Sequence, residues 1–168
     1  MKSSKGFSLV ELIIVIAIMA ILVGVMAPML YKYINKTKVS ADIQLCDTVK
    51  EALMIAMADP DVLMDNNSAP YLKKLNDGDY LAMGTVGNGN ELGACIKDIT
   101  GFDCCSISGY RNEFETKVAR NQGFLGAQYF EGQLYVWIDY SDNTGKDDTP
   151  YRASRANQVD GSFVIAAK

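Results

Sequence analysis

The stretch "KGFSLVELIIVIAIMAILVGVMAP", residues 5 to 28, decides the architecture of this chain. No residue from Leu12 to Leu30 is charged, and a helix begun at Phe7 would be about 36 Å long, enough to cross ~30 Å of hydrocarbon. The run nevertheless keeps the carboxylate of Glu11 close to its start. The sequence therefore predicts a membrane-spanning helix that carries one acidic side chain.

Two simpler interpretations of this segment leave Glu11 unexplained. A secretory signal peptide fits poorly, because the apolar region is too long and no small-x-small cleavage site follows it. A plain signal anchor fits the composition, but an ionised carboxylate costs roughly 2.5–3.5 kcal/mol at the centre of a membrane helix. The next cation, Lys32, lies about 30 Å further along the helix. We therefore expect an α-amine as the partner, created if the chain is cut between Gly6 and Phe7.

Composition limits the classes of function. The chain has 168 residues, with 16 basic against 20 acidic side chains and a formal net charge of −4. An acidic chain without a basic stretch argues against nucleic-acid binding. The absence of histidine removes the commonest general base and metal ligand, and no S-x-x-K pair or nucleophile elbow occurs. We expect a non-enzymatic protein without a cofactor, built from one membrane segment and one modest domain.

Residues 31–58 are expected to continue the helix into that domain. Apolar side chains recur at helical spacing and predict a core-facing stripe formed by Leu45, Val49, Ala52, Leu53 and Ala56. Other faces are expected to carry Asp42, Asp47, Lys50 and Glu51. The helix should stop at Asp59-Pro60, because proline disfavours a helical conformation in the residue before it. The sequence thus predicts one helix of about 50 residues.

The rest of the chain predicts a small antiparallel sheet. Residues 60–110 are rich in turns, with strand-like pieces at 80–86 and 94–99. The clearest strand signal is "AQYFEGQLYVWIDY", residues 127–140, which predicts a hairpin across Glu131-Gly132 with alternate side chains facing the core. A final strand is expected in "SFVIAAK", residues 162–168. A long helix on a small antiparallel sheet is an α+β architecture.

Cysteines and acidic residues give two candidate sites in this domain. Cys46 is expected to be a buried thiol, and a disulfide from Cys95 to Cys104 or Cys105 would close the shortest loop, although four cysteines allow three pairings. An oxygen-rich loop could hold Ca²⁺, the alternative being a solvated turn; its residues are Asp139, Asp142, Asn143, Asp147 and Asp148.

The N-terminal pattern resembles a known family. Gly6-Phe7-Ser8-Leu9-Val10-Glu11, after a short basic leader and before about twenty apolar residues, is similar to the class III signal of type IV pilins and pseudopilins. Pro28 also matches the family pattern, and the resemblance covers roughly residues 1–58. It implies the pilin fold, with a long N-terminal helix packed on a small antiparallel sheet that forms the head.

The resemblance also assigns roles to individual residues. Gly6 would precede the cut made by a prepilin peptidase, which would also methylate the new amine of Phe7. Glu11 would pair with the Phe7 amine of an adjacent copy as each subunit leaves the bilayer. Pro28, with Gly24, weakens the helix, so we expect a kink or unwound stretch near residues 24 to 28.

The resulting hypothesis is a structural subunit of a type IV pilus, similar to type IVa major pilins. Its expected parts are a leader (1–6), a membrane and filament-core helix (7–30), an amphipathic continuation (31–58) and a head (59–168). Its expected partners are other copies of itself, membrane lipid, the prepilin peptidase, and the assembly platform with its ATPase. The precursor would lie in the cytoplasmic membrane and the filament outside the cell, serving adhesion, twitching motility or biofilm formation.

Two alternatives share parts of this pattern. A major pseudopilin of a type II secretion system has the same N-terminus, and the resemblance implies a calcium site for it. A membrane-anchored binding domain that never polymerises would also account for the apolar helix. Assembly into filaments distinguishes the pilin from the binding domain, and calcium binding distinguishes the pseudopilin.

Overall fold

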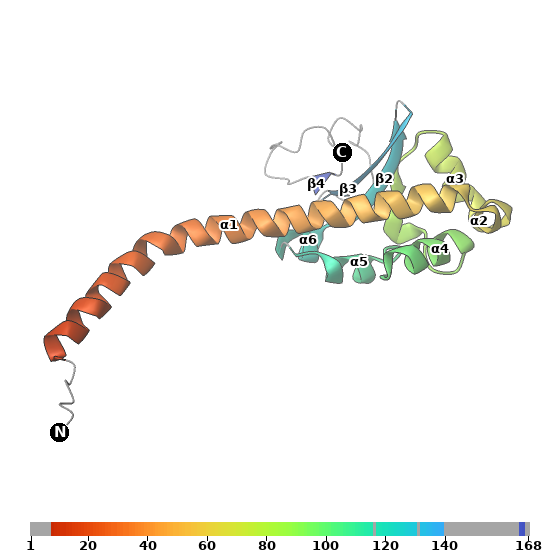
Figure 1. The fold of residues 1–168 in the computed structure, drawn as a ribbon. Helices are drawn as coiled ribbons and strands as arrows, with labels where there is room; N and C mark the ends of the chain where they lie inside the picture. Colours follow the sequence, from red (N-terminus) through yellow and green to blue (C-terminus); the bar gives the residue numbers. More distant parts are fainter. Residues whose placement is uncertain (1–7, 116, 131, 140–164, 167–168) are drawn as a thin grey trace, which may run out of the picture. The chain divides into compact units, whose positions relative to one another are not determined.

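The computed structural model describes residues 8–115, 117–130, 132–139 and 165–166. It falls into two compact units, residues 1–37 and 38–168, and we call the second unit the head. Figure 1 shows the order of its elements along the chain, which are α1 (Leu9–Ala58), α2 (Pro60–Met64), α3 (Ala69–Asn76), β1 (Leu81–Ala82), η1 (Met83–Thr85), α4 (Glu91–Thr100), α5 (Ile107–Glu113), α6 (Lys117–Gln122), β2 (Phe124–Phe130), β3 (Gln133–Asp139) and β4 (Ile165–Ala166). The predicted α+β architecture is confirmed.

The first helix, α1, has the length that the sequence predicts. It runs for 50 residues and ends at Ala58, immediately before Asp59-Pro60. Proline suits the first turn of a new helix, where its missing N–H is not needed, and Pro60 begins α2. The Asp59 side chain accepts a hydrogen bond from the Asp61 N–H at 2.8 Å and so caps this short helix.

The predicted weak point at residues 24–28 is helical in this single chain. Pro28 lies inside α1, which is an α-helix throughout its length. Proline has no N–H, so the carbonyl of Gly24, four residues earlier, loses its helical partner while the neighbouring hydrogen bonds of the helix can remain. Unwinding in a filament therefore stays a prediction. Its physical basis is the one helical hydrogen bond that Gly24 and Pro28 cannot form with each other.

Within the head, α1 supplies one wall of the core. The predicted stripe is confirmed at Val49, Ala52, Leu53 and Ala56, all fully buried. Leu45 is only partly buried, because the centre of the stripe passes through Cys46 instead. Asp42 is a correction: it was expected on another face but is 1 % exposed. Its Oδ1 accepts a 2.7 Å hydrogen bond from the backbone N–H of Glu115, which explains how the core accommodates it.

Residues 60–110 correct the expectation of an irregular segment with short strands. Residues 94–99 lie inside α4, and of residues 80–86 only Leu81–Ala82 form a strand. Two caps explain α4: the Asn90 side chain accepts from the Gly93 N–H at 2.7 Å, and Gly101 ends the helix with φ +77°. Leu92 and Ile96 face the core four residues apart, which is the helical period.

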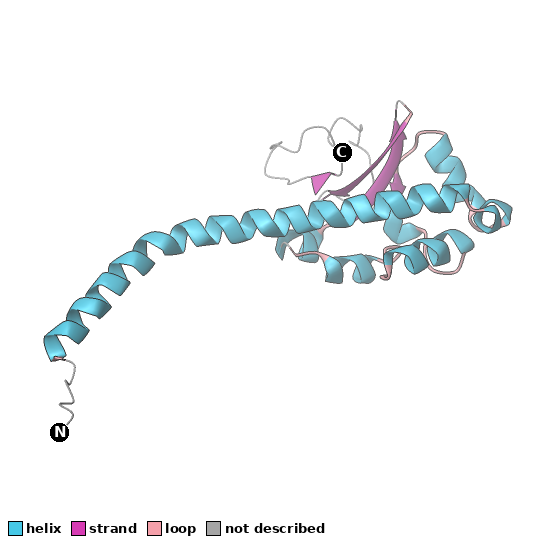
Figure 2. Cartoon of the chain, in the orientation of Figure 1, coloured by secondary structure: helices cyan, strands magenta, loops and turns pink. Residues whose placement is uncertain are grey.

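The hairpin predicted around Glu131-Gly132 is confirmed, although its first strand begins earlier, at Phe124. The sheet has the antiparallel order β1-β2-β3-β4, and β4 supplies the expected final strand (Figure 2). Gly132 turns with φ +79°, a conformation that costs glycine little. Core-facing side chains meet across the strands, with Leu125 opposite Ile138 and Ala127 opposite Val136.

Candidate functional site

The apolar half of α1 has no protein partner in the single chain. By length and composition α1 can cross a membrane, and its most apolar segment is not buried. A helix that is apolar on every side requires an apolar environment, which lipid or other helices can supply. Its exposed large side chains are Leu9, Val10, Leu12, Ile13, Ile14, Val15, Ile16, Ile18, Met19, Ile21, Leu22, Val23, Val25, Met26, Met29 and Leu30.

Glu11 has a structural contact that the sequence argument did not consider. Its Oε2 accepts a 2.9 Å hydrogen bond from the backbone N–H of Ser8, just before α1 begins at Leu9. This is one half of a capping box, in which the side chain three residues into the helix satisfies the amide of the cap residue. The S-x-x-E spacing from Ser8 to Glu11 was the available signal.

This contact fixes where the carboxylate lies. Glu11 is in the first turn of α1, where the aligned peptide dipoles favour a negative charge. Its side chain reaches back toward the N-terminus, which is the direction of the predicted cut. Gly6 and Phe7 themselves lie outside the described residues.

The candidate disulfide is not formed in the structure. None of the four cysteines forms a disulfide; Cys46, Cys104 and Cys105 are buried and Cys95 is partly buried on α4. The neighbouring sulfurs of Cys104 and Cys105 are 3.9 Å apart, almost twice a disulfide bond length. Burial, and then the carboxylates of Asp42 and Asp47, raise the pKa of the Cys46 thiol, so this predicted buried thiol is unreactive.

The candidate calcium loop lies almost entirely outside the described residues. Asp139 ends β3, and its backbone alone is described, while the remaining candidate ligands are Asp142, Asn143, Asp147 and Asp148. Within the described part of the chain, no group of three or more His, Cys, Asp or Glu residues is placed to hold a metal ion. The calcium site therefore stays a prediction for the undescribed loop.

Comparison with known proteins adds to this geometry. Residues 1–27 match the profile of the prokaryotic N-terminal methylation motif. The chain is 33 % identical over 144 residues to the type IV major fimbrial protein FimA of Dichelobacter nodosus, an alignment that covers 81 % of each chain. It is 37 % identical over 87 residues to the type IV major pilin protein PilE1 of Neisseria gonorrhoeae, covering 51 % of this chain and 41 % of PilE1. No solved structure matches the chain.

Proposed function

The chain belongs to the type IV pilins, a family of structural proteins rather than enzymes, and from this premise we propose that it is a subunit of a type IV pilus. The observation that carries the proposal is the unpartnered apolar helix with one carboxylate in its first turn. Prepilin peptidase would cut after Gly6 and methylate Phe7. The proposed parts are the leader (1–6), the membrane and filament helix (7–30), its continuation (31–58) and the globular part that follows (59–168). The head, as defined above, consists of this globular part and residues 38–58 of the helix.

The same apolar surface can serve two environments in succession. In the precursor it would lie in the lipid of the cytoplasmic membrane, and in the filament it would pack against the helices of sibling subunits. Burying one large apolar side chain is worth about 1.5–3 kcal/mol, and lipid supplies this as well as protein does. Apolar burial therefore favours neither state by much, and a specific interaction is needed to favour the filament.

Glu11 is the residue that supplies this specificity. A charged carboxylate costs roughly 2.5–3.5 kcal/mol at the centre of a membrane helix and less near its end, where Glu11 lies. An ion pair at 4 Å is worth about 4 kcal/mol at an effective dielectric constant of 20. Pairing with the Phe7 amine of a neighbouring subunit would thus offset the cost of burial. In the uncleaved chain, the partner of Glu11 among the described residues is the Ser8 amide. Cleavage would then make the stronger partner available.

The capping contact makes the mutational test sharper. Glu11→Gln keeps an oxygen that can accept from the Ser8 N–H but removes the charge, whereas Glu11→Ala removes both. We expect both variants to insert into the membrane and both to lose filament assembly, measured as pilin in the fraction sheared from the cell surface. Normal assembly by Glu11→Gln would refute the charge pairing and leave only a capping role.

Processing has its own test. Filaments sheared from cells should yield, as their dominant N-terminus, a methylated Phe7. Gly6→Val should leave a precursor of unprocessed size in the membrane, because Gly6 is the residue of the motif that directly precedes the proposed cut. A dominant N-terminus at another residue, or a mature-size Gly6→Val protein, would contradict the proposed cleavage.

The wider assignments rest on family membership. The assembly platform and its ATPase would extract each subunit, and unwinding between Gly24 and Pro28 would accompany its entry into the filament. Heads on the filament surface would serve adhesion, twitching motility or biofilm formation. A major pseudopilin of a type II secretion system is the second candidate, and raised thermal stability of the head in Ca²⁺, abolished by chelation, would favour it.

A further inference from the structure

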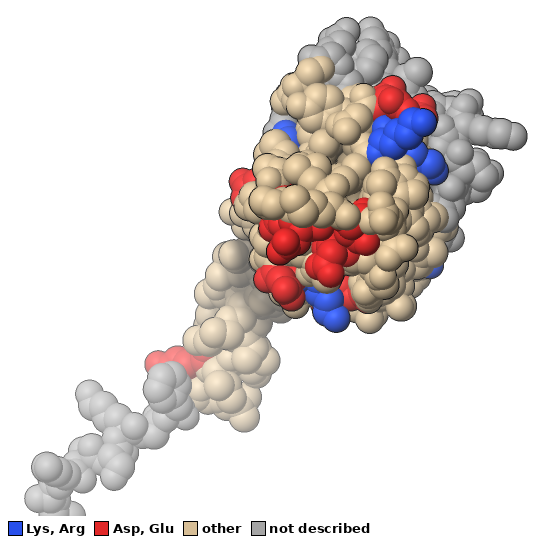
Figure 3. Space-filling model, turned by 90° about the vertical axis from the view of Figure 1, so that its right-hand side faces the viewer, with Lys and Arg blue, Asp and Glu red and all other residues tan. Residues whose placement is uncertain are grey.

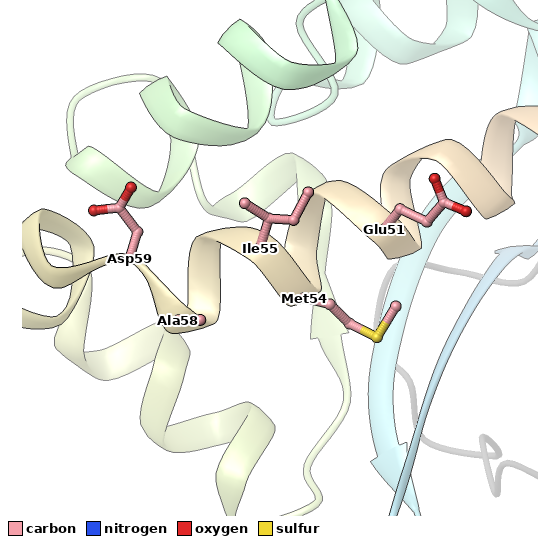
Figure 4. A pocket seen from close by; sticks show the side chains of 5 residues that line it. All are labelled: Glu51, Met54, Ile55, Ala58 and Asp59. Carbon is pink, nitrogen blue, oxygen red and sulfur yellow. The ribbon is translucent and has the colours of Figure 1, made fainter.

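The end of the head carries an apolar surface that none of the described residues covers. Met54, Ile55, Leu63 and Met64 are 46, 54, 58 and 82 % exposed, although they belong to the ordered helices α1 and α2. Figure 4 shows Met54 and Ile55 projecting from the last turns of α1, between Glu51 and Asp59. Met54 and Ile55, with Glu51, Ala58 and Asp59, line a shallow depression of about 630 Å³. Apolar side chains gathered in this way mark an interaction surface.

Carboxylates surround this apolar surface. From Glu51 to Leu72 the chain contains four acidic residues, Glu51, Asp59, Asp61 and Asp65, and no Lys or Arg. Asp61, Met64, Asp65 and Glu91 line a second depression of about 370 Å³ beside α2. Figure 3 shows Asp and Glu side chains gathered on the end of the head that carries α2 and α4. We call this the tip surface, formed by Glu51, Met54, Ile55, Asp59, Asp61, Leu63, Met64 and Glu91.

The tip carboxylates differ in what they already do. Asp59 caps α2, and Asp65 accepts hydrogen bonds from the Ser68 hydroxyl at 2.6 Å and the Glu91 N–H at 3.0 Å. Glu51 and Asp61 are exposed, and within the described residues neither has an ion-pair partner. Glu51 and Asp61, like the exposed Glu91, are therefore carboxylates that remain available to a cation from outside.

The complementary surface is on α1 of the same chain. Residues 31–38, which we call the neck, contain Lys32, Lys36 and Lys38, and no acidic residue occurs between Glu11 and Asp42. All three lysines are exposed. Between them the neck exposes large apolar side chains, those of Tyr31, Tyr33 and Ile34. The neck thus combines apolar and basic groups, as the tip surface combines apolar and acidic ones.

We propose that the neck of one subunit docks on the tip surface of a second copy of this chain, with Lys32 and Lys36 facing Glu51 and Asp61. This inference rests on the proposed function, because it describes one contact within the filament. Two different patches of the chain meet in it, so the contact is heterologous, and heterologous contacts that do not close a ring build open helical filaments. The negative tip would repel anionic lipid, which favours protein as its occupant.

Chemical cross-linking of native filaments tests the contact directly. Filaments sheared from wild-type cells are treated with a carbodiimide, which joins a lysine amine to a carboxylate only when the two are in contact. We expect peptides that link Lys32 or Lys36 to Glu51 or Asp61. Filaments assembled from a mixture of ¹⁴N- and ¹⁵N-labelled pilin identify a link between two copies, because only such a link gives cross-linked pairs that combine the two isotopes. Filaments whose neck lysines cross-link only to other carboxylates would overturn the inference.

Charge reversal with rescue tests its importance. Lys32→Glu with Lys36→Glu should lower the pilin recovered in sheared filaments by about tenfold, since each pair changes from attraction to repulsion. Adding Glu51→Lys and Asp61→Lys should restore it. The matched control, Lys73→Glu with Lys74→Glu, changes the same charge on exposed residues of α3 and should assemble normally.

The outcomes separate the two proposals. If the protein is absent from wild-type filaments, the proposed function fails. If it is present but the neck variant assembles normally, or the charge-swapped variant stays defective without neck-to-tip cross-links, only the docking inference fails. The amount of each pilin variant in the membrane, measured in the same cells, identifies any loss of filaments that comes from misfolding. In that case the cross-links of wild-type filaments decide whether the neck contacts the tip surface.

Discussion

Asp42 is the buried residue whose replacement tests the head most sharply. It lies on α1 and is 1 % exposed, and its Oδ1 accepts the Glu115 N–H at 2.7 Å. The hydrogen bond joins α1 to the segment that follows α5, across 73 residues of chain. Asp42→Ala removes this acceptor and leaves a backbone donor without its partner.

The expected loss follows from two opposing terms. Hydrogen bonds to charged groups contribute about 1.5–3 kcal/mol, and this one is partly buried. Removing a buried carboxylate also relieves its desolvation, which reduces the net cost. We expect Asp42→Ala to lower the free energy of unfolding by about 2 kcal/mol, and Asp42→Asn, which keeps a neutral acceptor, by about 1 kcal/mol.

The single tryptophan makes this measurable. Trp137 is 1 % exposed on β3, so its fluorescence reports unfolding of the head in urea for the full chain in detergent micelles. With a denaturant slope of about 2 kcal/mol per molar, Asp42→Ala should shift the midpoint by about 1 M. Gln44→Ala, an exposed change on the same helix, should stay within about 0.5 kcal/mol. An Asp42→Ala midpoint equal to that of this control would refute the reasoning.

Three further predictions use other parts of the head. Gly93→Ala should cost about 1–3 kcal/mol, because a Cβ there would overlap a backbone carbonyl, whereas Gly89→Ala meets nothing within 4 Å; urea midpoints compare the two. Iodoacetamide should label Cys95 before the three buried thiols, as mass spectrometry would show. Labelling should be slow at neutral pH and faster as the pH rises, because burial and nearby carboxylates raise the pKa of the Cys95 thiol. The Ser68 hydroxyl and backbone amides hold the pKa of Asp65 below its ordinary value of 3.8. The ionised carboxylate therefore stabilises the folded state above pH 3.8, and this stabilisation is lost as the pH falls through the lower pKa of the folded state. Asp65→Asn should remove this pH dependence and so flatten the acid-unfolding profile.

The long helix and the hairpin could be predicted because their signals are local. An unbroken apolar run needs no tertiary contact to define a helix that crosses a membrane. The end of α1 follows from Asp59-Pro60, and the hairpin from the aromatic and β-branched residues on both sides of Glu131-Gly132. The candidate site at the N-terminus could be predicted for the same reason, because Glu11 is an acidic residue within an otherwise apolar segment.

The helices of the middle segment could not be read as easily. The residues of α4 favour strand and helix about equally, and the decisive groups are the caps at Asn90 and Gly101. Asp42 was placed on an exposed face because a carboxylate has no reason to be buried until a distant donor is known. That donor, the Glu115 amide, enters only through the tertiary fold.

By itself, then, the sequence determines a chain with an apolar helix, one carboxylate at its start and a small α+β head. Only the tertiary structure shows that Glu51 lines one depression with Met54 and Ile55, and that Asp61 lines a second one with Met64. It also shows that the neck lysines are exposed. The physical reason is that local conformation depends on neighbouring residues, whereas burial and surface charge depend on which distant segments pack together. The same rule applies to Glu11, whose capping contact is local and whose proposed partner is another molecule.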